Sequence, residues 1–309
     1  MPKTTYPTGT CDACHARDRG DIIGGIYRSS SGEAELRELY AEATNALGVL
    51  VESRSVETPY GTTHVLVAGE PDAPPAVVFH GGNFLNPYSL AWMLPALRRF
   101  RVFAPDTVGH PGLSDQRRLP TRDDSYGMWA CSVLSALQLD RASIIGTSYG
   151  GGIALRLCEV APQRIERLVL HVSSSIATAP FVRIAAVGFP MLVYRFAPSR
   201  ERLIRIARPL WGDDPDDLGL RILDTVLRQV RLEAALPRLS TREDLRTLQC
   251  PVLVVAATHD VLFPAELVLR RARHLMPSGL HTVELKGVHV PRNADLDRLR
   301  SSIREFCET

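Results

Sequence analysis

A serine flanked by two glycines lies near the middle of the chain, in the run Gly146-Thr147-Ser148-Tyr149-Gly150. A short apolar stretch precedes this run, and a helical pattern follows it. The G-x-S-x-G arrangement is typical of a nucleophile elbow, in which a sharp strand-to-helix turn holds a serine hydroxyl out at the end of a sheet. A serine held in this way can attack a carbonyl carbon and form a covalent acyl intermediate.

The five-residue pattern alone is weak evidence. Glycine and serine are common enough for it to occur by chance in roughly one chain in ten of this length. A glycine-rich turn with a capping serine gives the same letters. The interpretation therefore depends on whether the sequence also supplies a general base for the serine and an acid that orients this base.

Candidates for both partners follow two later strands. The apolar run 251–256 leads into Asp260, and the run 282–285 leads into His289. The carboxyl ends of parallel strands meet at one edge of a sheet, so we expect both side chains to lie close to Ser148. In the predicted mechanism Ser148 attacks, and His289 takes its proton and passes it to the leaving group. Asp260 fixes the imidazole tautomer and stabilises the imidazolium.

Asp260 and His289 also have non-catalytic interpretations, and other residues compete for their roles. Asp260 is also a plausible helix cap before Pro264, and His289 a solvated loop histidine, but their placement after successive strands favours catalysis. His259 competes as a base, although neighbours in extended chain point in opposite directions. The segment that starts at His171 follows another strand and offers no carboxylate, which favours Asp260 as the acid.

An acyl-transfer site also needs donors for the developing oxyanion. The backbone amide that follows the nucleophile, that of Tyr149, is the first expected donor. The second is expected in an early strand-to-helix loop, and His80-Gly81-Gly82-Asn83 occupies that place. We predict the Gly82 amide as this donor, with Asn83 as the alternative.

With these motifs in place, the chain resembles the α/β-hydrolase superfamily, and within it the bacterial carboxylesterase-like serine hydrolases. The resemblance runs from about Pro59 to the C-terminus, interrupted by a variable segment. Residues 104–114 are similar to the family's D-x-x-G-x-G-x-S loop, with one extra residue between the glycines. Epoxide hydrolases and haloalkane dehalogenases place an aspartate where Ser148 stands. The resemblance implies no metal and no organic cofactor.

The pattern of apolar runs predicts the architecture. A hairpin is expected over 49–68, and from Ala76 continuously apolar strands alternate with helices, which is typical of a parallel sheet buried on both faces. We therefore predict an α/β-hydrolase fold, with a mostly parallel eight-stranded sheet flanked by helices and an inserted helical cap. The predicted parts are a core of residues 33–174 and 247–309, a proline-broken cap of residues 175–246, and a poorly ordered tail of residues 1–32.

Composition limits the classes of partner and the cellular location that we expect for the protein. The net charge of +2 predicts no nucleic-acid and no membrane partner. The basic, apolar stretch 195–208 fits a membrane-surface helix, but packing on the core is favoured. No signal peptide is evident, so we predict a cytoplasmic protein with reduced cysteines. Cys11, Cys14 and His15 match a haem-attachment pattern that requires export, and we interpret them as incidental.

The predicted function is a serine hydrolase that cleaves a carboxylic ester, lactone or thioester of a hydrophobic small molecule through an acyl-enzyme intermediate. Two other enzyme classes use the same triad, a C–C bond hydrolase and a biosynthetic acyl transferase or cyclase. A hydrolase-fold ligand-binding protein is the non-enzymatic alternative. The sequence is compatible with both a monomer and a homodimer.

Overall fold

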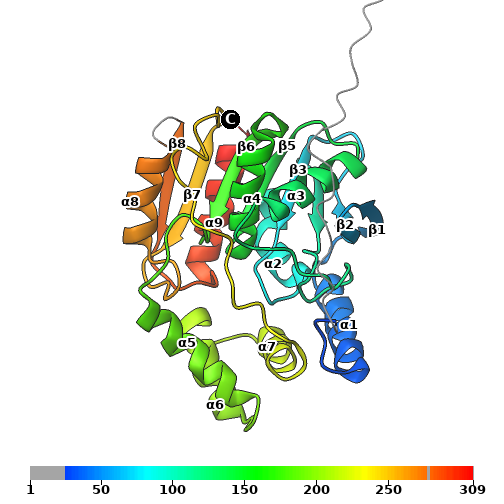
Figure 1. Ribbon diagram of the computed structural model, residues 1–309, viewed down its shortest axis with the longest axis vertical. Helices are drawn as coiled ribbons and strands as arrows, with labels where there is room; N and C mark the ends of the chain where they lie inside the picture. The colour runs from blue at the N-terminus through cyan, green and yellow to red at the C-terminus, as the bar shows by residue number, and fades with distance from the viewer. Residues whose placement is uncertain (1–24, 277–278, 309) are drawn as a thin grey trace, which may run out of the picture.

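The computed structural model describes residues 25–276 and 279–308, and its centre is one eight-stranded sheet (Figure 1). The strand order is β1-β2-β4-β3-β5-β6-β7-β8, and β2 runs antiparallel to both of its neighbours while the pairs from β4 to β8 are parallel. The strands are β1 Val51–Thr58, β2 Gly61–Ala68, β3 Pro75–Phe79, β4 Arg101–Pro105, β5 Ala142–Thr147, β6 Ile165–His171, β7 Val252–Ala257 and β8 Leu280–Leu285. The predicted mostly parallel eight-stranded sheet is confirmed.

Helices cover both faces of the sheet, which explains the continuously apolar strands. Neighbouring strand residues belong to different cores: Val77 packs with α3 (Ser125–Ala136), α4 (Tyr149–Val160) and α8 (Ala265–Leu275), whereas Val78 packs with α2 (Asn86–Met93) and α9 (Asn293–Glu308). Successive side chains of a strand point to opposite faces, so both sets must be apolar when both faces are covered. In Figure 1, α4 lies in front of the sheet and α9 behind it.

Short 3₁₀ turns follow two of the helices. Helix α2 is followed directly by η1 (Leu94–Ala96), and Pro95 lies inside that turn. A second turn, η2 (Pro162–Arg164), connects α4 to β6. Proline lacks the amide hydrogen that a continuing α-helix needs, which accounts for the early end of α2.

Three helices are inserted between β6 and β7: α5 (Phe181–Tyr194), α6 (Arg200–Trp211) and α7 (Asp217–Gln229). The Ser199 side chain caps α6 by accepting a hydrogen bond from the Arg202 amide, and Asp216 caps α7 at 2.7 Å from the Gly219 nitrogen. Since this insertion leaves the carboxyl end of β6, it lies over the edge of the sheet at which β5 also ends (Figure 1). No helix in the described part of the chain has both the length and the apolar character needed to cross a bilayer.

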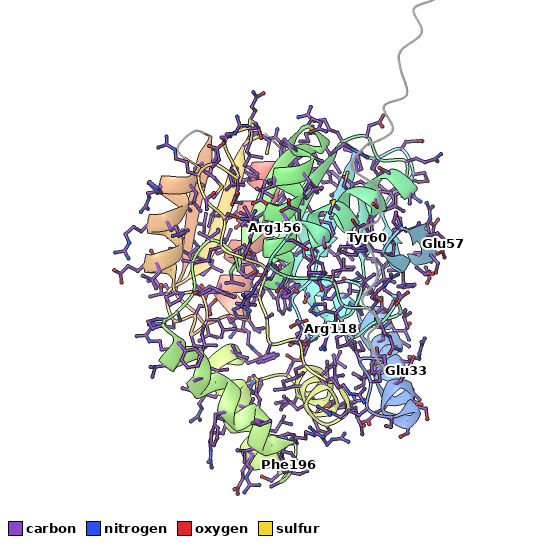
Figure 2. The ribbon with its side chains drawn as sticks, viewed as in Figure 1. Glu33, Glu57, Tyr60, Arg118, Arg156 and Phe196 are labelled. Atoms are coloured by element: carbon purple, nitrogen blue, oxygen red, sulfur yellow. The ribbon has the colours of Figure 1, made fainter. Side chains whose placement is uncertain are left out.

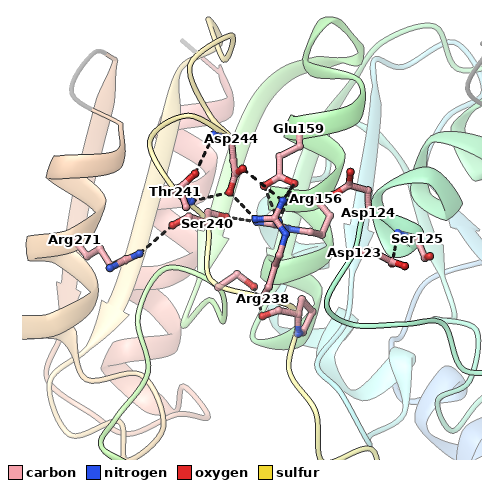
Figure 3. Close-up of polar contacts among 12 residues, drawn as sticks. Asp123, Asp124, Ser125, Arg156, Glu159, Arg238, Ser240, Thr241, Asp244 and Arg271 are labelled. Atoms are coloured by element: carbon pink, nitrogen blue, oxygen red, sulfur yellow. Dashed lines mark hydrogen bonds and ion pairs between the residues drawn. The ribbon is translucent and has the colours of Figure 1, made fainter.

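The chain that leaves the insertion is fastened to α4 by a buried ion-pair network (Figure 3). Glu159 accepts from Arg156 at 2.7 Å and from Arg238 at 2.8 Å, and the Arg156 side chain is only 1% exposed. Arg238 also pairs with Asp244 at 2.6 Å, while Arg156 donates to the Ser240 hydroxyl. These contacts hold residues 238–244 against α4, the helix that follows Ser148.

The first described residues contradict part of the predicted poorly ordered tail. Residues 1–24 of the 1–32 segment, with Cys11, Cys14 and His15, lie outside the described residues. The prediction is wrong for residues 26–32, because Tyr27 is buried, forms an antiparallel bridge with Val230 and donates its hydroxyl to the Gly112 carbonyl at 3.1 Å. Helix α1 (Ser30–Asn45) begins inside the predicted tail, since Ser29 accepts from the Gly32 amide at 3.0 Å.

Candidate active site

Ser148 occupies the sharp turn between β5 and α4. Its backbone has φ 53° and ψ −114°, an unfavourable region for a residue with a side chain. The Ser148 amide donates to the His171 carbonyl at 2.9 Å, and the Ser148 carbonyl accepts from Ser174 and Gly151, both at 3.0 Å. Three hydrogen bonds, two of them to the stretch 171–174 and one to α4, therefore hold a strained conformation, as functional serines at such turns require.

The two glycines of the motif are explained by close packing around this turn. A Cβ atom on Gly146 would lie 2.5 Å from the Gly150 carbonyl oxygen, and one on Gly150 would lie 2.2 Å from the Phe79 carbonyl oxygen. Both contacts are with backbone, which side-chain motion cannot relieve. The first turn of α4 thus rests directly on the ends of β3 and β5, and only glycine allows that approach.

The structure brings together Ser148, His289 and Asp260. His289 Nε2 lies 3.1 Å from Ser148 Oγ, and His289 Nδ1 lies 2.8 Å from Asp260 Oδ2. The other carboxylate oxygen, Oδ1, accepts from the amides of Leu262 at 2.8 Å and Phe263 at 3.1 Å. The alternative base, His259, is exposed and takes no part in these hydrogen bonds.

The environment of Asp260 decides which nitrogen of His289 carries a proton. Burial by itself raises the pKa of this carboxyl, but His289 and the two backbone amides outweigh it, so the pKa lies below its usual value. The carboxylate is therefore ionised and must receive a proton from Nδ1. This assignment leaves Nε2 with a lone pair directed at the Ser148 hydroxyl.

The predicted oxyanion donors, the amides of Gly82 and Tyr149, lie beside the serine. A Cβ atom on Gly82 would be 3.0 Å from the Tyr149 Cβ, which shows how closely the two loops approach. Neither amide donates a hydrogen bond to another residue within the described ranges. The alternative donor, the Asn83 amide, is occupied, because it donates to His110 Nδ1 at 3.0 Å.

A cavity of about 280 Å³ opens in front of Ser148, between the Gly82 loop and the inserted helices. Its wall is predominantly apolar and includes Phe84, Trp92, Met191, Trp211, Leu227 and Leu262. Glu233 also lines it, and the carboxylate of this residue is engaged by other groups: Oε1 accepts from the Ala235 amide at 2.8 Å and Oε2 lies 3.6 Å from Arg118 Nε. No arginine or lysine of the described chain lines the cavity.

Comparison with known proteins agrees with this geometry. Residues 75–203 match the model of the alpha/beta hydrolase fold family. The 2-hydroxymuconate semialdehyde hydrolase of Pseudomonas sp. strain CF600 is 36% identical over 244 residues, which cover 67% of this chain and 77% of the relative. The chain belongs to the α/β hydrolase family.

Other members of the α/β hydrolase family that resemble the chain are esterases. Carboxylesterase YbfK of Bacillus subtilis is 26% identical over 278 residues, with 83% of this chain and 88% of the relative covered. Its crystal structure has a TM-score of 0.77 at 20% sequence identity, covering 90% of this chain and 98% of that structure. The protein is thus an enzyme of the serine hydrolase class, and its relatives include bacterial carboxylesterases.

Two buried histidines, His80 and His110, support the Gly82 loop, a role that the sequence did not indicate. His80 Nε2 accepts from the Thr107 amide at 2.9 Å, and its Nδ1 lies 2.7 Å from the Gly81 carbonyl oxygen, to which it donates. His110 accepts from the Asn83 amide. Burial lowers the pKa of both imidazoles, so both are neutral and can act as acceptors. Both residues lie within segments that suggested the family, but spacing alone did not indicate their contacts.

His171 is a third buried histidine, at the end of β6. Neither of its ring nitrogens has a hydrogen-bond partner in the part of the chain that the structure describes, and its ring meets Trp92 edge-on at 6.3 Å. Burial, together with nearby His289, lowers the pKa of His171 to about 3. The neutral ring therefore adds no positive charge beside Asp260 and His289.

Proposed function

We propose that the protein is a carboxylesterase that hydrolyses esters of hydrophobic small molecules, with Ser148 as its nucleophile. The observation that supports this most strongly is the continuous hydrogen-bonded chain Ser148–His289–Asp260 at the mouth of an apolar cavity. The predicted cap of residues 175–246 fits this proposal, because α5 and α7 supply part of the cavity wall.

The proposed reaction has two halves. Ser148 Oγ attacks the ester carbonyl carbon while His289 Nε2 takes its proton, and the Gly82 and Tyr149 amides donate to the oxyanion of the tetrahedral intermediate. His289 then protonates the leaving alcohol as the C–O bond breaks. Water repeats the sequence on the acyl-enzyme, giving the acid and free Ser148. Lactones and thioesters present the same carbonyl to the same groups.

A C–C bond hydrolase is the second candidate, since the 36% identical relative is named a 2-hydroxymuconate semialdehyde hydrolase. Muconate derivatives carry a carboxylate, and a site for them needs a cationic partner. The cavity here is predominantly apolar and lacks arginine and lysine in its described wall. These features favour an uncharged ester over an anionic dienoate.

Hydrolysis of p-nitrophenyl esters of increasing acyl length tests the proposal. We expect kcat/KM to rise with acyl length until the cavity is filled, and Ser148→Ala to lose on the order of 10³-fold or more in kcat. A 2-hydroxy-6-oxo-dienoate measured in parallel tests the second candidate. Full esterase activity in Ser148→Ala, or cleavage of the dienoate alone, would overturn the esterase proposal.

A further inference from the structure

Helix α5 is apolar on both of its faces, although only one of them is covered. The inner face places Ile184, Val187 and Met191 in the wall of the cavity. The outer face carries five large exposed apolar side chains, and Phe196 follows in the turn just beyond the helix. These six side chains are 39–81% exposed and are here called the α5 patch: Phe181, Val182, Phe189, Leu192, Val193 and Phe196. Figure 2 shows Phe196 at the outer end of the insertion, far from the sheet.

The spacing of the α5 patch shows that it is one surface. Positions 182, 189 and 193 recur at intervals of seven and four, so they lie on one side of a helix of 3.6 residues per turn. An apolar helix is normally buried on all sides, and a contiguous exposed apolar surface marks an interaction site. The α5 patch therefore needs a partner.

Exposed arginines of α5, of α6 and of the segment between them lack carboxylate partners within the described residues. Arg183, Arg195, Arg200, Arg202 and Arg205 are exposed, and none forms an ion pair within the described ranges. Residues 181–213 hold six arginines against Glu201 and Asp213, a local charge of 6 − 2 = +4. The sixth arginine, Arg208, pairs with Asp213 at 2.9 Å. The whole-chain charge of +2 conceals this local excess.

The combination of apolar surface and positive charge selects among partners. A symmetric dimer through the α5 patch would bring two surfaces of the same positive charge together, because such an interface pairs each patch with its own copy. An anionic lipid bilayer offers negative headgroups to the arginines and an apolar layer to the phenylalanines. We propose that the α5 patch docks on an anionic lipid surface, with α5 lying in the plane of the interface.

This proposal departs from one expectation drawn from the sequence and keeps another. Packing on the core was favoured for residues 195–208, and Leu203, Ile206 and Ala207 of α6 are indeed buried. The predicted absence of a membrane partner rested on net charge, which averages over the α5 region. Docking would also place the inner face of α5, and thus the cavity, beside esters dissolved in the bilayer. This last step rests on the proposed esterase function.

Co-sedimentation with vesicles tests the docking without catalysis. The full chain carrying Ser148→Ala is mixed with vesicles of phosphatidylcholine alone or of phosphatidylcholine with phosphatidylserine. We expect binding to the anionic vesicles that weakens as salt is added. Phe189→Ser with Phe196→Ser should reduce this binding at least tenfold, and Arg200→Gln or Arg202→Gln should reduce it about fivefold each.

Matched controls come from exposed residues elsewhere. Leu50→Ser removes a side chain that is 92% exposed outside the α5 patch, and Arg304→Gln removes an exposed arginine on α9. Both should bind vesicles like the parent protein. Equal binding to the two kinds of vesicle, or equal losses in patch and control variants, would overturn the proposal. So would a dimer in light scattering that Phe189→Ser dissociates, because the partner would then be a second copy.

Activity separates this inference from the proposed function. In an otherwise native background, Phe189→Ser with Phe196→Ser should hydrolyse a soluble short-chain ester at the parental rate, because neither residue lines the cavity. The same variant should lose activity on a long-chain ester held in anionic vesicles. Failure of the parent on every ester, with vesicle binding intact, would reject the esterase and leave the docking surface in place.

Discussion

The Asn83 side-chain amide forms two hydrogen bonds with the backbone of Glu233. Asn83 Nδ2 donates to the Glu233 carbonyl, and the Glu233 amide donates to Asn83 Oδ1, both at 2.7 Å. Asn83 directly follows Gly82, a proposed oxyanion donor, and Glu233 belongs to the segment that leaves the inserted helices. The pair therefore connects the position of the insertion to the geometry of the loop beside Ser148.

Removing the Asn83 side chain should lower kcat more than it changes KM. Loss of a whole oxyanion donor costs on the order of 10²–10³ in kcat, so a displaced Gly82 amide should cost about tenfold. Asn83→Gly is the informative variant, because Asn83 has φ 53°, which glycine adopts without strain. Asn83→Ala removes the same two hydrogen bonds and also leaves a residue with a side chain at this strained φ. Steady-state kinetics of Asn83→Gly with an unchanged kcat would contradict the coupling.

The sequence predicted the parts of the site that depend on short segments. The elbow is five consecutive residues, and Asp260 and His289 directly follow strands, so the parallel sheet brings them to one edge. The structure places all three within a single hydrogen-bonded chain. The exact starts of helices were harder to predict, because capping side chains such as Ser29 and Ser199 decide them.

Contacts between distant residues were not predictable from patterns. Asn83 meets Glu233, Arg156 meets Ser240 and Tyr27 meets Val230 across 84 or more positions of the chain. No periodicity or spacing encodes such pairs, since each depends on how the insertion folds back on the core. The exposed face of α5 could not be predicted either, because an all-apolar helix gives no sign of which side is covered.

The buried network around Arg156 should contribute strongly to stability. Glu159→Ala leaves the buried Arg156 guanidinium without its carboxylate, which should lower the free energy of unfolding by about 3 kcal/mol. Glu243→Ala provides the control, because the Glu243–Arg246 pair is 80% and 66% exposed and should contribute less than about 1 kcal/mol. Urea denaturation of both variants measures the difference, and equal midpoints would count against a stabilising network.

Glycine at position 150 should be irreplaceable for folding. Gly150→Ala puts a methyl group 2.2 Å from the Phe79 carbonyl oxygen, so the free energy of unfolding should fall by about 3 kcal/mol or more. The matched change Gly188→Ala, in helix α5, meets no atom within 4 Å and should stabilise by about 0.5–1 kcal/mol. Thermal unfolding compares them, and a Gly150→Ala protein as stable as the parent would refute the close packing.

Stability should fall in acid partly because His171 is buried and neutral. The folded protein binds no proton at His171 until about pH 3, whereas the unfolded chain binds one below about pH 6.5. Between these values unfolding takes up a proton, so the free energy of unfolding decreases as the pH falls. His171→Phe should remove about 2 kcal/mol of the loss between pH 8 and pH 5. Urea denaturation at both pH values measures this, and an unchanged difference would contradict it.

The identity of the nucleophile is tested most directly by a fluorophosphonate probe and peptide mass spectrometry. The reagent forms a covalent bond with an activated serine, and His289 at 3.1 Å from Ser148 Oγ supplies the activation. We predict one adduct per chain, located on Ser148, with loss of esterase activity in proportion to labelling. Labelling should disappear in Ser148→Ala and slow down strongly in a folded His289→Ala variant. An adduct on any other residue, or full activity after complete labelling of Ser148, would contradict the proposed mechanism.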